Sequence, residues 1–509
     1  MSDLSLTGRD LTLAVLAEFD AQRPRVALAT SAHQNMQASV KVVRDVIHTG
    51  RVCYGINTGF GALARQHISH DQLIQLQYNL VRSHACGVGE PLSAAVTRRI
   101  LLLKANSLAI GNSGIRPEVV DTLLALLNND ILPVIPAQGS VGASGDLAPL
   151  AHLALALIGE GEAYHQGKQL QGKAVLAAAS VHPVQLQAKE GLALLNGTQV
   201  SAALAIEGLL QARATLFSAI VIGALTVEAL AGSYSPFDAR IQTVRNLQGQ
   251  IKVAEWFRTL LNGSEIWQSH QGCDRVQDPY AVRCMPQVYG AVWDTLAHAA
   301  GILSRECNSV SDNPLIFGEE VLSGGNFHAE SLGFVADFMA IAAAELGSMS
   351  ERRTDLLLRK INPRLEMFLA RSPGVESGFM IAHVTAAALA SENKTLAHPA
   401  SVDSIPTSAG QEDHVSMAPW AGRKLLQILE NLRHILAVEM LAAAAAVEAQ
   451  RPLHTTSVLE RLLAGLRQTT PVHNSDRRLD GDIRKLAIRL EQGLLLEYLP
   501  QEASQLLLA

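Results

Sequence analysis

Long helices are the feature of this sequence that most limits how the chain can fold. Residues 423–450 contain no proline or glycine, and four leucines recur there at the spacing of one helix face: Leu425, Leu429, Leu432 and Leu436. Alanine and leucine dominate, β-branched alternation is scarce, and comparable helical patterns occupy residues 73–80, 96–110, 119–127, 200–230, 288–309 and 334–358. Such segments bury their apolar faces by packing on one another, so we predict a mainly α fold built as an elongated bundle of long helices.

Breaks in the pattern suggest how the chain is divided. Pro373, Pro406 and Pro452 fall in stretches between predicted helices, and strand-like pieces are short, for example residues 52–56 before Asn57. A chain of 509 residues is long enough for two or three domains. We expect a smaller N-terminal mixed domain over residues 1–200 and a long-helix bundle over residues 201–509.

Charge and cysteine content exclude several classes of partner. The formal net charge is −6 and aromatic residues make up 4% of the chain, which argues against nucleic acid or an anionic membrane as a partner. The N-terminal segment carries the charged residues Asp3, Arg9 and Asp10 and does not resemble a signal peptide. The uncharged stretch 214–227 is shorter than the roughly 20 residues that span a bilayer. No C-x-x-C pair occurs among the five cysteines, which are Cys53, Cys86, Cys273, Cys284 and Cys307. We therefore expect a cytoplasmic protein with reduced thiols.

The run GSVGASGDLAPL, residues 139–150, contains the strongest indication of chemistry. If the amide nitrogen of Gly145 attacks the carbonyl carbon of Ala143, a five-membered ring closes around Ser144. Loss of water, including the Ser144 hydroxyl, leaves a methylene conjugated to an imidazolone, an electrophile that no standard side chain supplies. Gly145 suits this step because it has no side chain and adopts strained backbone angles. A serine-hydrolase elbow, G-x-S-x-G, would need glycine where Asp146 stands.

Other glycine-rich and polar clusters fall between the predicted helices. They are residues 54–61, 277–283, 323–327 and 404–414, in addition to 139–146. Loops of unusual composition on a rigid frame are where function tends to lie. Clusters so far apart in sequence suggest one composite site, formed within a chain or shared between subunits.

The run at 139–150 resembles the signature of the histidine and aromatic amino-acid ammonia-lyases. Their prosthetic group, 4-methylidene-imidazol-5-one (MIO), is made from such a tripeptide, so the resemblance implies MIO formed from Ala143, Ser144 and Gly145. The similarity extends from about residue 50 to about residue 450. It implies a homotetramer in which each active site takes loops from three subunits. We expect no metal or nucleotide, because the close pair His67 and His70 has no further ligands that we can assign.

Two further segments resemble substrate-handling parts of this family. The octet YGINTGFG, residues 54–61, is similar to the mobile loop whose tyrosine is the candidate base for the β-proton, which would be Tyr54. A tyrosine acts as a base only if a nearby electrophile or cation lowers its pKa. In QDPYAVRC, residues 277–284, the resemblance implies that Arg283 holds the substrate carboxylate through two parallel hydrogen bonds. Tyr280 would join the catalytic groups, and Gln277 would line the pocket.

The remaining site residues are also assigned by resemblance. Asn196 matches an asparagine that hydrogen-bonds the MIO or the substrate, and Phe327 matches a residue packed beside the prosthetic group. His84 and Glu412 are expected to surround the substrate ring, since histidine lyases carry Ser-His and Gln-Glu-Asp-His at these places. Phenylalanine lyases have apolar residues and Gln there, and some tyrosine-selective relatives keep the histidine. Glu412 therefore favours an imidazole substrate.

We expect deamination of L-histidine to trans-urocanate and ammonia. Two alternatives use the same chemistry: a tyrosine lyase that forms 4-coumarate, and a 2,3-aminomutase that returns the ammonia to the β-carbon. A third, a helical scaffold without activity, is disfavoured by the intact tripeptide with Tyr54, Tyr280 and Arg283. Fumarase-type lyases are also long-helix proteins, but their Gly-Ser-Ser loop is not found. Arg82, Cys86 and Met285 depart from the residues expected in histidine lyases and bear on ring specificity.

Overall fold

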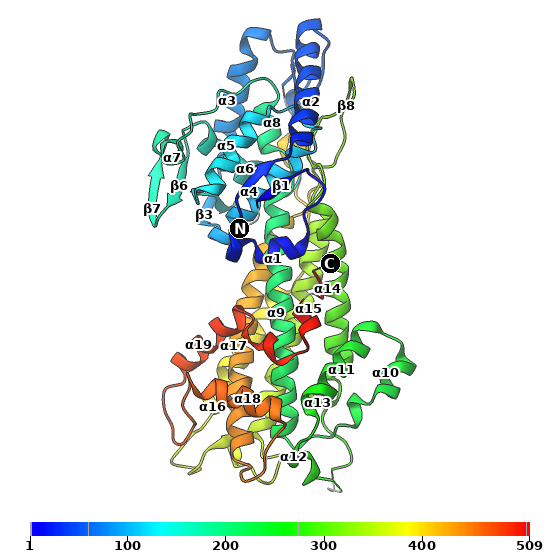
Figure 1. Ribbon diagram of the computed structural model, residues 1–509, viewed down its shortest axis with the longest axis vertical. Helices are drawn as coiled ribbons and strands as arrows, with labels where there is room; N and C mark the ends of the chain where they lie inside the picture. The colour runs from blue at the N-terminus through cyan, green and yellow to red at the C-terminus, as the bar shows by residue number, and fades with distance from the viewer. Residues whose placement is uncertain (1–2, 60, 272–274, 505, 509) are drawn as a thin grey trace.

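The computed structural model is mainly α-helical and elongated, which confirms the predicted fold class (Figure 1). It describes residues 3–59, 61–271, 275–504 and 506–508, so Phe60 of the predicted mobile loop and Cys273 lie outside the described residues. The long helices run along the long axis of the molecule, and the N-terminal region sits at one end of them.

Four long helices form the centre of the bundle: α9 (Gln199–Ala229), α14 (Met285–Glu306), α15 (Glu330–Leu358) and α17 (Ala418–Glu448). Helix α9 packs against the other three and is buried on nearly all sides, as expected of a helix that is apolar all round. Helices α9 and α15 are long and apolar enough to cross a membrane. However, 89% and 67% of their most apolar windows are buried inside the protein.

The N-terminal region mixes short helices with small sheets. Its helices are α1 (Leu13–Gln22), α2 (Thr30–Thr49), α3 (Leu73–His84), α4 (Ala94–Ala109), α5 (Pro117–Asn128), α6 (Leu147–Leu157), α7 (Lys173–Ala178) and α8 (Glu190–Leu195). Its strands pair as β1 (Leu4–Leu6) with β2 (Val26–Leu28) in parallel, β3 (Val88–Pro91) with β5 (Pro136–Gln138), and β4 (Leu132–Pro133) with β6 (Glu162–His165) and β7 (Lys168–Gln171). One hydrophobic cluster continues from this region into the bundle, so the division at residue 200 stays a prediction.

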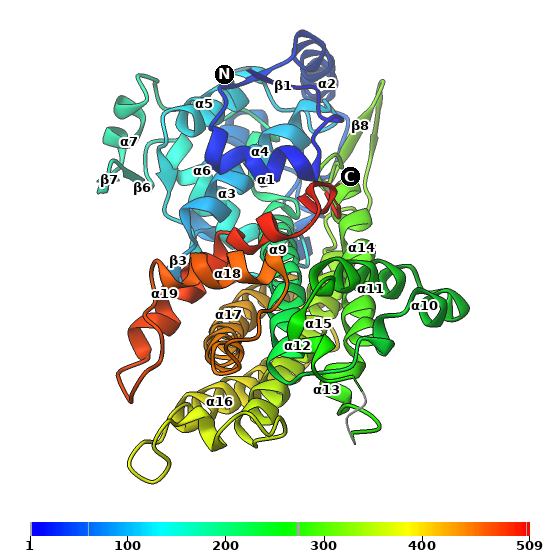
Figure 2. The same cartoon turned by 60° about the horizontal axis from the view of Figure 1, so that its bottom comes forward.

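The remaining elements surround the bundle. Strands β8 (Leu315–Phe317) and β9 (Glu320–Leu322) form a hairpin between α14 and α15. The turned view in Figure 2 shows α10 and α11 on one side and α18 and α19 on the other. The bounds of these outer helices are α10 (Ala239–Arg245), α11 (Gln248–Leu261), α12 (Glu265–Gln268), α13 (Tyr280–Arg283), α16 (Met380–Leu396), α18 (Ser457–Arg467) and α19 (Asp480–Glu491).

Each of the seven segments predicted from leucine and alanine spacing is a helix, but the predicted strand at residues 52–56 is wrong. The chain turns there instead, because Asn57 folds back on the preceding backbone. Its Oδ1 accepts from the amide of Cys53 at 2.8 Å, and its Nδ2 donates to the carbonyl of Arg51 at 2.9 Å. A side chain that bonds to its local backbone in this way competes with strand pairing.

Candidate active site

The loop from Gly139 to Asp146 lies against the start of α9 at a distance that only glycine allows. Gly145 has a φ of +70°, and a Cβ there would lie 2.0 Å from the carbonyl oxygen of Gly197. The next amide, of Asp146, donates to that same oxygen at 2.7 Å. The backbone around Gly145 is therefore pressed against residue 197 with no room for a side chain.

The Asp146 carboxylate fixes the C-terminal end of this loop through hydrogen bonds. It is buried, and it accepts from the Ser201 amide at 2.7 Å, from Ser201 Oγ at 2.9 Å and from Ser140 Oγ at 3.2 Å. Burial raises the pKa of Asp146 to about 6, although these hydrogen bonds favour the charged form. Because Ser201 lies in the first turn of α9, the acid also connects the loop to the beginning of this long core helix.

Two other segments hold the start of the loop. Ser416 Oγ donates to the Gly142 carbonyl at 3.0 Å, and the Met417 amide donates to the Val141 carbonyl at 2.9 Å. Gly142 has a φ of +67°, and a Cβ there would lie 2.3 Å from Ser416 Oγ. The tripeptide of Ala143, Ser144 and Gly145 is thus fixed on both sides, which suits a reaction of the backbone with itself.

Ser144 and Glu412 meet although they are far apart in sequence. Ser144 Oγ donates to Glu412 Oε1 at 2.6 Å, and the carboxylate also accepts from Thr407 Oγ1 at 2.6 Å and Ser408 Oγ at 2.8 Å. Partial burial works against ionisation of Glu412, but these hydrogen bonds outweigh it and hold its pKa below the ordinary value. Glu412 is therefore negatively charged at neutral pH.

His84 ends α3 near this carboxylate. Its Nδ1 lies 3.0 Å from Ser83 Oγ. Burial lowers the pKa of His84, and the negative charge of Glu412 offsets only part of that effect. At neutral pH the pair therefore combines a neutral imidazole with a carboxylate.

Asn196 precedes the Gly197 contact and is itself buried. Its Nδ2 donates to the Asn313 carbonyl at 3.0 Å, whereas its Oδ1 has no hydrogen-bond partner among the described residues. A buried oxygen without a hydrogen-bond partner can accept a hydrogen bond from a bound ligand. Phe327, two residues before Ala329, is also close to the loop, because the Ala329 amide donates to the Gly142 carbonyl at 3.3 Å.

The predicted mobile loop lies at this same end of α9. A Cβ on Gly55 would lie 2.7 Å from Pro314 and 2.8 Å from Leu192 of α8, so the turn after Tyr54 is packed closely. The short turn at residues 61–63 packs against residues 408–410, next to Glu412. The structure therefore brings Tyr54, His84, Asn196, Phe327 and Glu412 to the end of α9 that holds the tripeptide.

Gln277, Tyr280 and Arg283 lie at the opposite end of α9. Asp278 accepts from the Ser233 amide at 2.7 Å, just beyond the last residue of that helix. A helix of 31 residues is about 46 Å long, and Figure 1 shows α12 and α13 at one end of the molecule with α6 and α8 towards the other. Tyr280 is 73% exposed, and the Arg283 guanidinium lies 5.4 Å from the centre of its ring. These three residues cannot meet the tripeptide of their own chain.

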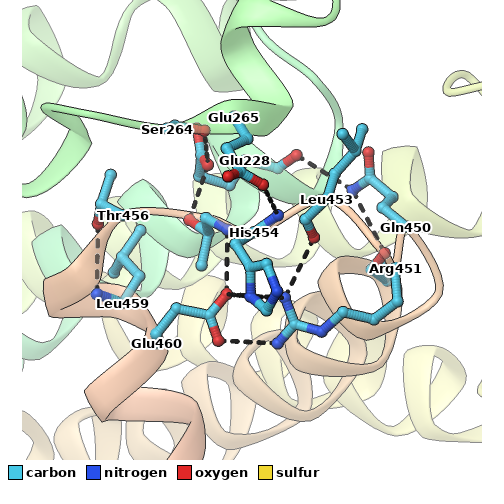
Figure 3. A network of polar contacts seen from close by, with 12 residues as sticks. Glu228, Ser264, Glu265, Gln450, Arg451, Leu453, His454, Thr456, Leu459 and Glu460 are labelled. Carbon is cyan, nitrogen blue, oxygen red and sulfur yellow. Dashed lines mark hydrogen bonds and ion pairs between the residues drawn. The ribbon is translucent and has the colours of Figure 1, made fainter.

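Polar contacts fix this second end of α9. Figure 3 shows Glu228, near the last turn of α9, together with Ser264 and residues 450–460. The Glu228 carboxylate accepts from the hydroxyls of Ser264 and Tyr234, and from Thr455 Oγ1 at 2.7 Å. The loop that carries Gln277 and Tyr280 therefore starts from a part of the molecule that several hydrogen bonds hold in place.

Some contacts at the tripeptide end were not found from the sequence. His328, Glu330 and His414 offer ligand atoms that all lie within 4.8 Å of one another, which is a possible metal site among the described residues. No local spacing reveals it, because His414 is 86 positions from His328. Lys104 of α4 is equally hidden in sequence, and its Nζ donates to the Asn196 carbonyl at 2.7 Å.

Comparisons with known proteins bear on the family and the fold of this chain. The model of the family described as aromatic amino acid lyase matches residues 11–468. A curated histidine ammonia-lyase from Burkholderia cenocepacia is 53% identical over 486 residues, which cover 95% of this chain and 96% of the relative. The crystal structure of histidine ammonia-lyase from Trypanosoma cruzi has a TM-score of 0.91 and 40% identity, covering 100% of this chain and 98% of that one. Tyrosine aminomutase from Streptomyces globisporus has a TM-score of 0.92 and 34% identity, covering 98% of each chain.

Proposed function

The chain belongs to the aromatic amino acid lyase family and is a carbon–nitrogen lyase, and we propose that it converts L-histidine to trans-urocanate and ammonia. The observation that supports this substrate best is the ionised Glu412 beside Ser144. A carboxylate there can accept a hydrogen bond from a ring nitrogen of histidine. A bare phenyl ring would leave Glu412 Oε1 without a hydrogen bond once the Ser144 hydroxyl has been lost.

The tripeptide Ala143, Ser144 and Gly145 fits the MIO group that the family implies. Gly145 has no room for a side chain, and the Ser144 hydroxyl already lies in a hydrogen bond. Once formed, this group supplies an electrophile that withdraws electrons from the substrate. Asn196 Oδ1, buried without a partner, is positioned as an acceptor for the prosthetic group or the substrate amine.

Proton handling is assigned to Tyr54. Its phenolate takes the β-proton of the substrate. The loop that carries Tyr54 begins at a tightly packed turn and contacts residues 408–410, in the segment that carries Glu412. Phe327 packs beside the prosthetic group and limits the room available to the ring.

The substrate carboxylate is bound by Arg283 of another subunit, with Tyr280 and Gln277 beside it. The length of α9, about 46 Å, supports this assignment, since Arg283 and Ser144 lie towards opposite ends of that helix in the same chain. A homotetramer is supported by apolar side chains left exposed on α15, namely Phe334, Phe338 and Ile341. Phe338 and Ile341 border a groove of about 720 Å³ between α14 and α15. Such a surface is typical of a contact between subunits of a cytoplasmic enzyme.

Two related activities remain alternatives under this proposal. The tyrosine aminomutase with a TM-score of 0.92 shares the whole fold, so backbone similarity does not separate a lyase from a mutase. A tyrosine lyase would use His84 to bind the phenol hydroxyl. The products distinguish all three activities, because a mutase retains nitrogen at the β-carbon.

The decisive experiment follows the ultraviolet absorption of urocanate, coumarate and cinnamate with histidine, tyrosine and phenylalanine in parallel. We expect histidine to be the best substrate. Glu412→Gln should lower kcat/KM for histidine by about a hundredfold and affect tyrosine far less, as expected when a charged hydrogen bond is lost. Asp403→Asn is the matched control, because Asp403 is exposed on the same loop. A wild-type preference for tyrosine, or full histidine turnover in Glu412→Gln, would contradict the substrate assignment, and a β-amino product would indicate the mutase.

A further inference from the structure

Lys104 is a buried cation at the base of the tripeptide loop that the proposed reaction does not use. It lies in the middle of α4 and is 1% exposed. Its Nζ donates to the Asn196 carbonyl at 2.7 Å and lies 3.4 Å from Gln199 Oε1. Both partners are neutral oxygens at the junction between α8 and α9.

Among the described residues, Lys104 forms no ion pair with a carboxylate. Asp312 Oδ2 is bound to Lys189 Nζ at 2.7 Å, and both of those side chains are buried. Asp146 is occupied by Ser140 and Ser201. Burial lowers the pKa of Lys104 to about 7; Asp312 and Asp146 raise it, whereas Lys189 lowers it further. Burying a cation without a paired anion is unfavourable for stability, so packing alone does not explain this residue.

The position of the Asn196 carbonyl links Lys104 to the tripeptide. This carbonyl belongs to the peptide bond between Asn196 and Gly197, and its orientation sets that of Gly197. The Gly197 carbonyl is the group that leaves no space beside Gly145 and accepts the Asp146 amide at 2.7 Å. A shift of the 196–197 peptide would therefore release the backbone of Gly145 from its confined position.

We propose that Lys104 is a positioning residue for ring closure, holding the 196–197 peptide against Gly145 while the prosthetic group forms. This inference rests on the proposed function, because it concerns the maturation of the MIO group. Lys104 touches none of the reacting atoms and acts through the Asn196 carbonyl.

The reaction that it assists needs no outside reagent. The Gly145 nitrogen forms a bond to the Ala143 carbonyl carbon, and that oxygen leaves as water with the proton of the Gly145 amide and the proton of the Ser144 amide. The Ser144 Oγ then leaves as a second water with the proton on the Ser144 Cα, which creates the methylene double bond. Two waters are lost, and no electrons are gained or lost overall.

The test measures the mass of the peptide that contains residues 139–150, in the purified full-length protein at a fixed time after synthesis. Wild-type peptide should lack two waters. Lys104→Met and Lys104→Gln remove the cationic donor and should make this loss roughly tenfold slower, as expected when one charge-assisted hydrogen bond is removed. Lys104→Arg keeps a cationic donor and should recover part of the rate.

Lys424→Met is the matched control. Lys424 is also 1% exposed, but it pairs with Asp337 between α17 and α15, and in the described structure it forms no hydrogen bond with residues 196–197. We expect this variant to lose thermal stability and to keep a fully dehydrated peptide. Circular dichroism and the elution volume of each variant establish that only folded protein is compared. A folded Lys104→Met or Lys104→Gln protein that dehydrates at the wild-type rate overturns the proposal.

A wild-type measurement decides the question if neither neutral variant folds. In cell-free synthesis the rate of dehydration should fall as the pH rises from 6.5 to 8.5, because the ammonium of Lys104 loses its charge near pH 7. The charged groups around it, Asp312, Lys189 and Asp146, belong to the same buried cluster. A rate that rises steadily over this range overturns the proposal. Wild-type peptide that never loses water would instead refute the proposed function itself.

Discussion

The two ends of α9 each bury a carboxylate, yet only one of them lies beside the proposed reactive tripeptide. Asp146 is packed at the first turn of the helix and Glu228 near the last. Both accept hydrogen bonds from three donor groups, and burial raises the pKa of both. A buried acid with a raised pKa is therefore not in itself a sign of catalysis in this protein.

The difference lies in what surrounds each acid. The donors to Glu228 are all hydroxyls, of Tyr234, Ser264 and Thr455, and these can rotate. Asp146 accepts from two hydroxyls and also from a backbone amide of α9, next to a glycine that has no room for a Cβ. Confinement of the backbone, an unpartnered Asn196 oxygen and a buried cation distinguish the end that carries the tripeptide. Rigid main-chain contacts can hold a strained geometry, whereas rotating hydroxyls adapt to their neighbours.

The largest effect is expected from Gly145→Ala. A Cβ at Gly145 would lie 2.0 Å from the Gly197 oxygen, so ring closure should fail and turnover should fall by at least about a thousandfold. Gly167→Ala is the matched control, because Gly167 has a similar φ of +74° and no atom within 4 Å of its Cβ position. Peptide mass and steady-state kinetics measure both. Equal behaviour of the two variants would show that φ alone, and not the close contact, is responsible.

Tyr54→Phe and Arg283→Lys test whether the two ends contribute different steps. Loss of the proposed base should lower kcat by roughly a hundredfold to ten-thousandfold with little change in KM. Loss of the two parallel hydrogen bonds to the substrate carboxylate should also raise KM, by roughly tenfold to a hundredfold. Steady-state kinetics with histidine measures both parameters. Near-normal turnover in Tyr54→Phe would remove Tyr54 from the mechanism.

Co-expression of two inactive chains should restore activity if the ends of α9 meet only across subunits. Ser144→Ala chains keep Arg283, and Arg283→Ala chains keep the tripeptide, so random assembly would leave about a quarter of the sites intact. The recovered specific activity, relative to wild type and to each variant alone, measures this. Light scattering should give a multiple of the 54.4 kDa chain mass. Absence of recovery from mixed assemblies, or a monomeric mass, would contradict a shared site.

The smallest effects come from neutralising the two buried acids. Gln at position 228 can donate to hydroxyls that rotate, so Glu228→Gln should change the free energy of unfolding by only about 1–3 kcal/mol and leave the peptide dehydrated. Asp146→Leu should impair dehydration, because the fixed Ser201 amide would lose its acceptor. Thermal unfolding and peptide mass give the two results, and dehydration at the wild-type level in Asp146→Leu would remove the distinction between the ends.

The raised pKa values of both acids predict that stability depends on pH in the same way. Their folded-state pKa values lie above the unfolded ones, so the folded state holds more protons and its stability falls as the pH rises through the folded pKa, which is about 6 for Asp146. Each neutral variant should therefore show a weaker decline in stability between pH 4 and 6 than wild type does. Chemical denaturation at several pH values measures it. An unchanged decline would mean that the acid titrates alike in the folded and unfolded states.

Local pattern in the sequence determined the long helices and the reactive tripeptide. The leucine spacing in residues 423–450 predicts α17, and Ala143, Ser144 and Gly145 are adjacent, so their chemistry can be recognised without a structure. The proposed role of Glu412 came from the resemblance of residues 411–414 to a run in histidine lyases, which is also local in sequence. Hydrophobic periodicity and covalent adjacency are properties of neighbouring residues.

Only the tertiary structure decided which distant groups meet. Hydrogen bonds of the Asn57 side chain produce a turn at residues 52–56, where the sequence predicts a strand. Lys104, Asn196 and Gly197 meet because α4 packs against α9. The separation of Arg283 from Ser144 likewise depends on where each lies along α9. Contacts of this kind depend on how helices pack across tens or hundreds of residues. The spacing of side chains within one segment therefore does not predict them.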